Sequence, residues 1–130
     1  MAKKRRRQEA WKDEPDEQDF PAATDYLSLL LPGLVSLSIV SELKGAETIY
    51  RKAKDLMRAS RLPLLPAENP HVAKDLKKVA KGNLFSPVLL VRGNAEAGST
   101  LIVADGYHRI CASYHLDEDA DIPCRLVGLP

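Results

Sequence analysis

The sequence has little net charge, few cysteines and no long hydrophobic run, and each shortage excludes a class of protein. Its 130 residues carry a formal net charge of only +1 at pH 7, so no global field favours nucleic acid or a membrane surface. The longest apolar stretch, residues 26–40, is interrupted by Pro32-Gly33 and by serines, and it is too short to span a membrane. One small domain with a modest core and no membrane contact is therefore expected.

The two cysteines, Cys111 and Cys124, are too few for a disulfide framework. The basic residues near the start of the chain are not followed by the apolar segment of a signal peptide. We therefore expect free thiols in a reducing compartment, and a cytoplasmic protein.

Residues 1–19 carry opposite charges in two blocks. A basic cluster spans residues 3–7, acidic residues continue to Asp19, and Trp11 is the only large apolar side chain before Phe20. This composition predicts a disordered charged tail over residues 1–19. The basic cluster could contact DNA, although the charges of the two blocks nearly cancel each other.

Residues 20–60 predict a helical extension without a catalytic pattern. Helices are expected over about 22–31, 34–43 and 46–60, with Pro32-Gly33 between the first two. Apolar residues recur at helical spacing in the last of them. The apolar surface of these helices is expected to pack on the second half of the chain or to form a homo-oligomer.

Residues 61–130 predict an α/β domain built from a helix, two strands, a helix and a last strand. Asn69-Pro70 is typical of a helix start, because asparagine caps the first turn and proline fits its first position. Strands are expected over 86–92, 100–104 and 122–127, of which the first is apolar enough to be buried on both faces. The predicted fold class is thus α/β, with a small mixed sheet and a helical N-terminal extension.

The second predicted strand runs into a helix through a turn that combines glycine with basic residues. It ends at Asp105-Gly106, and His108 and Arg109 follow in the first helical turn. The backbone N–H groups there lack helical partners and favour an anion, and glycine lets a ligand approach the backbone closely. Basic side chains oppose the helix dipole at this end unless an anion lies there. We therefore expect a phosphate site formed by Gly106, Tyr107, His108 and Arg109.

Three further residues are candidates for this site. Asp105 could hold a Mg²⁺ ion bound to a nucleotide or act as a base towards an acceptor hydroxyl, and it could equally be an ordinary helix cap. Glu68 is a second candidate base. Lys74, or Lys77 beside it, could reach a phosphate if its helix lies near Gly106; a solvated lysine face is the alternative.

The histidines and cysteines near the turn do not predict a metal site. His108 and His115 lie two helical turns apart, roughly 10 Å along the axis, so one ion cannot bind both. Cys111 is expected to be a small buried residue.

Several of these segments together resemble the ParB/sulfiredoxin superfamily, of the ParB-like nuclease domain type, over about residues 62–128. The resemblance lies in Asn69-Pro70, the strand after Ser86-Pro87, the turn Asp105-Gly106-x-His108-Arg109 followed by Ala112, and the last strand at residues 122–127. It implies a compact α/β fold in which this turn binds the phosphates of ATP or CTP, with or without Mg²⁺.

The resemblance also limits the expected activity. Tyr107 stands where sulfiredoxins need a cysteine, so sulfiredoxin activity is not expected, and neither is the DNA-binding domain that follows in ParB proteins. The resemblance therefore implies a nucleotide-binding protein. If it is an enzyme, it could be a phosphotransferase or a nucleotide hydrolase. The alternative is a non-enzymatic interaction or DNA-associated module with a degenerate nucleotide site.

Overall fold

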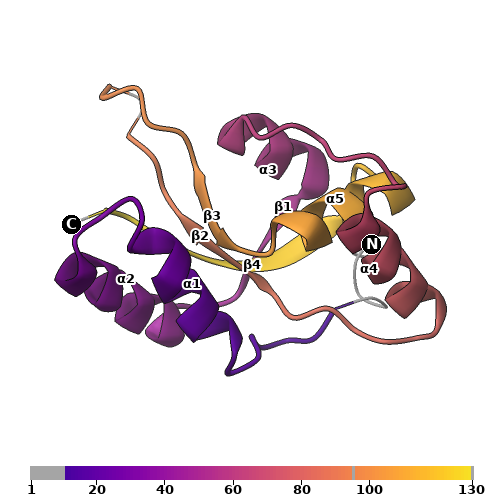
Figure 1. Ribbon diagram of the computed structural model, residues 1–130, viewed down its shortest axis with the longest axis horizontal. Coiled ribbons are helices and arrows are strands. Elements are labelled where there is room, and N and C mark those ends of the chain that lie inside the picture. The colour runs from indigo at the N-terminus through magenta and orange to yellow at the C-terminus, as the bar shows by residue number, and fades with distance from the viewer. Residues whose placement is uncertain (1–10, 95, 130) are drawn as a thin grey trace, which may run out of the picture.

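A computed structural model describes residues 11–94 and 96–129, in which four short strands form one open mixed sheet (Figure 1). The order across the sheet is β1 (Ile49–Lys52), β4 (Asp121–Val127), β2 (Val88–Val91) and β3 (Ile102–Asp105). The pair β4 and β2 is parallel, whereas β1 with β4 and β2 with β3 are antiparallel. These findings confirm an α/β fold with a small mixed sheet.

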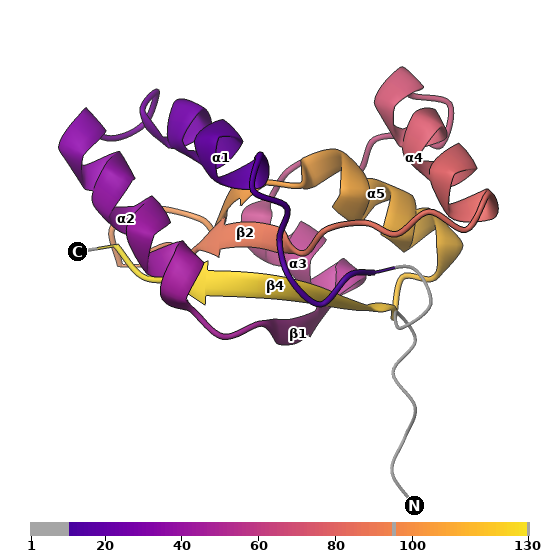
Figure 2. The same ribbon diagram turned by 90° about the horizontal axis from the view of Figure 1, so that it is seen from below.

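Helices cover both faces of the sheet (Figure 2). On one face lie α1 (Asp19–Leu27) and α2 (Gly33–Gly45), which contact β3 and β4. On the other lie α3 (Ala53–Ser60), α4 (Pro70–Ala80) and α5 (Tyr107–Leu116), with α5 between the other two. None of the described helices is long and apolar enough to cross a membrane.

Strand β2 connects the two hydrophobic cores. Its four residues are all buried, as predicted for a strand covered on both faces. Val88 and Leu90 belong to the core beneath α3, α4 and α5, whereas Leu89 and Val91 belong to the core beneath α1 and α2. This division follows from the alternation of side chains along a strand.

The start of α4 confirms the predicted cap. The side-chain oxygen of Asn69 accepts hydrogen bonds from the backbone N–H groups of His71 (3.0 Å) and Val72 (3.2 Å), and Pro70 occupies the first turn. These bonds satisfy two of the N–H groups that a helix start leaves without partners.

Residues 20–60 are not helical throughout, so the predicted extension needs a correction. The segment over 34–43 is the expected helix, α2, but the helix expected from residue 46 starts only at Ala53. The preceding residues form β1, which pairs from Ile49 opposite Cys124 to Lys52 opposite Asp121. Backbone pairing with β4 outweighs the helical spacing of the side chains there, and the extension therefore supplies an edge strand of the sheet.

The predicted tail also differs where the structure describes it. The Trp11 side chain is 3% exposed and its ring centroid lies 5.1 Å from that of Phe85. The backbone N–H of Lys12 donates to the Phe85 carbonyl at 2.8 Å. Residues 11–19 are therefore docked on the fold, because one buried tryptophan ring outweighs the charged composition around it. The basic cluster at residues 3–7 lies outside the described residues.

Candidate functional site

Gly106 makes the turn between β3 and α5. Its φ of 113° is a conformation that other residues rarely adopt. A Cβ atom there would overlap the Val88 side chain and lie 2.9 Å from Nη2 of Arg109. The turn therefore requires glycine for its backbone angle and for the space around it.

The first turn of α5 presents uncapped backbone N–H groups. The Gly106 carbonyl accepts the first helical hydrogen bond, from the N–H of Ile110 at 3.0 Å. The N–H groups of Tyr107, His108 and Arg109 precede that bond, and Gly106, the N-cap, has no side chain to satisfy them. No acidic residue lies in the first turn, so nothing from the helix itself neutralises its positive end.

This helix end borders a cavity of about 310 Å³. The cavity lies between the β3–α5 turn, α4, the segment before β2 and the segment that leads into α1. Its lining includes Asp105, Gly106, Tyr107, His108 and Arg109. The structure thus brings together all five residues that the sequence predicts for the turn.

Arg109 binds the protein's own acceptors. Its side chain is 14% exposed, and Nη1 donates to the Ser86 carbonyl at 2.6 Å and to the Ser86 hydroxyl. Nη2 donates to the Asp105 carboxylate, and a carboxylate oxygen of Asp19 lies 3.6 Å from Nη1. The Ser86 hydroxyl in turn donates to Asp19 at 2.5 Å. Arg109 therefore braces α5 against β3, α1 and the segment before β2.

Asp105 is not the helix cap that one interpretation of the sequence assigned to it. Gly106 occupies the N-cap position, and the Asp105 carboxylate bonds to Arg109. Burial raises the pKa of Asp105 to about 6; the Arg109 guanidinium opposes this rise and the Asp19 carboxylate adds to it. Asp105 is thus a carboxyl group that titrates close to neutral pH beside an open helix end.

His108 lies against a second histidine. Its ring centroid is 4.6 Å from that of His71 and 5.5 Å from that of Tyr107. Burial lowers the pKa of His108 below its ordinary 6.5, the neighbouring His71 lowers it further, and Asp75 opposes the shift. At neutral pH His108 is therefore uncharged, and it can donate one hydrogen bond to a ligand.

Lys78 is the lysine that borders the cavity, and the sequence pattern did not single it out. It lies on α4 with Asp75, which also lines the cavity, whereas Lys74, one turn earlier, is not among the lining residues. The helix carries lysines at positions 74, 77, 78 and 81. Which of them faces the turn depends on how α4 packs on α5, and spacing alone does not give that.

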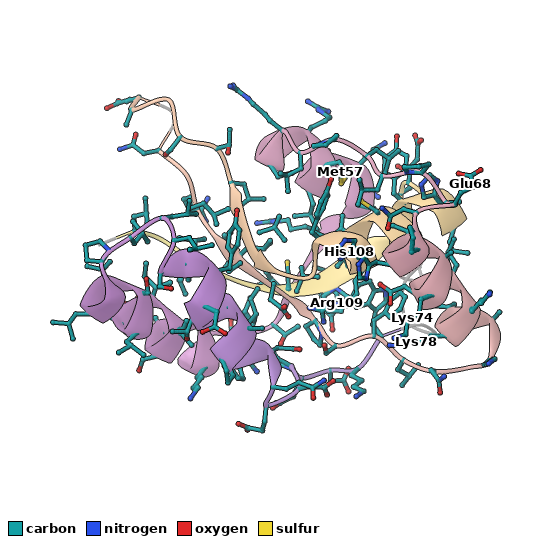
Figure 3. All side chains as sticks on the ribbon, viewed as in Figure 1. Met57, Glu68, Lys74, Lys78, His108 and Arg109 are labelled. Atoms are coloured by element: carbon teal, nitrogen blue, oxygen red, sulfur yellow. The ribbon has the colours of Figure 1, made fainter. Side chains whose placement is uncertain are left out.

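Glu68 does not reach the cavity. Its side chain is exposed in the segment before α4, and Figure 3 shows it beyond that helix, away from His108 and Arg109. The structure adds Asp19 and Ser86 instead, which contact Arg109. Neither has a sequence signal of its own, because their roles depend on contacts with a residue more than twenty positions away.

His115 and the two cysteines are not among the residues that line the α5 cavity. Nε2 of His115 lies 2.7 Å from the Leu65 carbonyl. Both cysteines are buried free thiols, and burial raises the pKa of Cys124 to about 12. Within residues 11–94 and 96–129, no three His, Cys, Asp or Glu side chains gather closely enough to hold a metal ion.

No protein-family model, curated protein or solved structure matches the chain. The resemblance to the ParB/sulfiredoxin superfamily therefore stays a prediction that depends on the residues of the turn and its neighbouring elements.

Proposed function

We propose that the protein binds a nucleotide, ATP or CTP, with its phosphates at the start of α5. The observation that supports this most is the open helix end, because the N–H groups of Tyr107, His108 and Arg109 precede the first helical bond beside a cavity. Such a helix end attracts phosphate through its N–H groups and its dipole.

The side chains have different roles in this proposal. Lys78 supplies an exposed positive charge, and His108 supplies a neutral hydrogen-bond donor. Arg109 positions the turn through its bonds to Asp105 and Ser86, rather than offering its whole planar fork to the phosphates. This modifies the expectation that the Arg109 side chain binds the phosphate.

The charges of the cavity favour the magnesium complex of the nucleotide. Among the described residues, four carboxylates line it, on Asp16, Asp19, Asp75 and Asp105, against two cations, Lys78 and Arg109. A free nucleoside triphosphate would meet this negative excess, whereas bound Mg²⁺ removes part of its charge. Magnesium commonly binds proteins through substrate phosphates and one or two carboxylates.

Any reaction at this site would depend on Asp105. A general base works best when its pKa lies near the working pH, and burial raises that of Asp105 to about 6. A phosphotransferase or hydrolase would use this carboxylate to take the proton from the attacking hydroxyl or water. The geometry supports binding more directly than it supports this step.

Calorimetric titration of the full chain tests the proposal. ATP, CTP and ADP are each titrated with and without Mg²⁺, and we expect binding that Mg²⁺ strengthens. Lys78→Gln should weaken it by about tenfold, as for a lost hydrogen bond to a charged group. Lys77→Gln is the matched control, because it makes the same charge change on the same helix outside the cavity lining. No heat with any nucleotide would refute the proposal.

A second candidate function is self-association through α1 and α2. Large apolar side chains are exposed around the turn between these helices, among them Leu29 (81%), Leu34 (84%) and Leu37 (57%). Asp25 and Lys44 line the apolar groove beside Leu37, and their opposite charges could pair across a two-fold axis between two copies of the chain.

Light scattering over a concentration series tests this candidate. We expect a dimer that Leu34→Gln dissociates, while Leu116→Gln, at another exposed leucine, leaves it intact. A monomer at every concentration would rule the candidate out.

A further inference from the structure

A second cavity, of about 380 Å³, lies between the end of α3 and the β2–β3 hairpin, two elements that Figure 1 shows on the same side of the molecule. It shares no lining residue with the cavity at α5. Arg58 and Arg61 reach it from the end of α3, and Arg92 reaches it from the hairpin. Three arginines of the described chain therefore line one small cavity.

No carboxylate lines this second cavity among the described residues. Arg58 has a weak partner in Asp55, at 3.8 Å and with both side chains largely exposed. Within the described chain, no ion pair involves Arg61 or Arg92. The cavity is thus electropositive, with two guanidinium groups free to receive an anion.

The backbone of Arg61 has an unfavourable, left-handed conformation. It ends α3 with φ 57°, and it is the only non-glycine residue with positive φ in the described chain. Helices that end in this conformation usually have glycine there. An arginine at such a position indicates that the side chain has a use that offsets the backbone strain.

The walls of this cavity are held together by the backbone. The N–H of Leu101 donates to the carbonyl of Ala59 at 3.1 Å, which ties the hairpin to α3. The two arms of the hairpin also approach closely. Their distance leaves no room for a Cβ on Gly93, which would overlap the Thr100 carbonyl. Backbone contacts therefore connect the segments that carry the three arginines.

We infer that this cavity binds a compact anion with several phosphate charges, such as pyrophosphate. The guanidinium group is planar and always charged, and it matches phosphate oxygens with paired donors. The hollow shape suits a compact ion. The lining residues that the structure describes include no aromatic side chain on which a base could stack, and stacking is how proteins commonly hold single-stranded nucleic acid. The inference is independent of the nucleotide site at α5.

Titration of the full chain with inorganic pyrophosphate, monitored by calorimetry and by backbone amide NMR shifts, tests the inference. We expect shifts at Arg92, Thr100 and Leu101, and binding that Arg92→Gln weakens by about tenfold. Arg61→Gly should weaken binding to a similar extent while raising the melting temperature, which separates loss of the ligand from loss of the fold.

Two controls separate binding at this cavity from binding elsewhere on the surface. Arg51→Gln makes the same charge change at an exposed residue of β1 outside the cavity, and binding should not change. Lys78→Gln removes the lysine at the α5 cavity and should leave the hairpin shifts in place. Equal weakening by Arg51→Gln, or shifts confined to residues 107–109, would overturn the inference. The inference would also be overturned if a DNA oligonucleotide bound the cavity more tightly than pyrophosphate in a competition titration. The cavity would then bind a nucleic acid backbone.

Discussion

The arginines at the two cavities of this protein differ in exposure and in hydrogen-bond partners. Arg109 lies at the α5 cavity with its guanidinium bonded to Asp105 and Ser86, and its side chain is only 14% exposed. Arg61 and Arg92 are exposed residues at the hairpin cavity, with no carboxylate in the described lining. An arginine in a sequence motif can therefore have its guanidinium bonded within the protein, whereas arginines outside any motif can lie at a cavity without a carboxylate partner.

The largest effect is expected from removing the Arg109 side chain, which connects α5 to β3, α1 and the segment before β2. Arg109→Ala should destabilise the protein by about 3–5 kcal/mol, because it leaves the Asp105 and Asp19 carboxylates largely buried without their shared cation. Arg92→Ala, at the other cavity, should change stability by less than about 0.5 kcal/mol. Urea unfolding of both variants measures the contrast. Equal effects would show that the two arginines do not differ in role.

A smaller loss is expected at the glycine of the turn. Gly106→Ala should cost at least about 2 kcal/mol, because it adds a clash with Val88 to an unfavourable φ. Gly82→Ala is the matched control, since that glycine also has positive φ (85°) but has nothing within 4 Å of an added Cβ. The difference between the two variants in thermal unfolding isolates the clash. No difference would mean that Val88 can move aside.

The pH dependence of stability should reveal the buried carboxyl group. The pKa of Asp105 is raised from 3.8 to about 6 in the folded protein, so between these values the folded chain binds more protons than the unfolded chain. The stability that this group contributes is complete below pH 3.8 and is lost as the pH rises through 6. Relative to Asp105→Asn, the wild type should therefore lose stability from about pH 4 to 6 and level off above. Urea unfolding of the two proteins across this pH range measures the difference. If their unfolding free energies changed with pH in parallel, the pKa of Asp105 would not be raised in the folded protein.

A change of about 1 kcal/mol should separate the effect of the Arg61 backbone from that of its side chain. Arg61→Gly should stabilise the protein by roughly 1 kcal/mol, since it relieves a left-handed backbone conformation. Arg58→Gly, inside α3, should destabilise it by about 1 kcal/mol because glycine is a poor helix former. Thermal unfolding compares them, and a loss of stability in both would show that the Arg61 side chain contributes packing.

The sequence predicts those parts of the fold that depend on neighbouring residues. Asn69-Pro70 predicts the start of α4, the apolar run at 88–91 predicts a strand buried on both faces, and Asp105-Gly106 predicts the turn into α5. In each case the chemistry that decides the structure lies within a few positions of the residue concerned.

Features that depend on distant residues could not be predicted in the same way. Strand β1 exists because β4 pairs with it from some seventy positions away. The partners of Arg109 include Asp19, ninety positions earlier, and Lys78 faces the cavity only because α4 packs on α5. The location of the candidate site was therefore predictable from its turn, whereas the charges that surround it were not.

The most direct test of the nucleotide proposal is a backbone amide NMR titration of the full chain with MgATP and MgCTP. If the phosphates bind at the open helix end, the amide signals of Tyr107, His108 and Arg109 should shift in a saturable way, and Lys78→Gln should raise the concentration at half saturation. Amide signals at residues 107–109 that stay in place at saturating concentrations of both nucleotides would contradict the proposal.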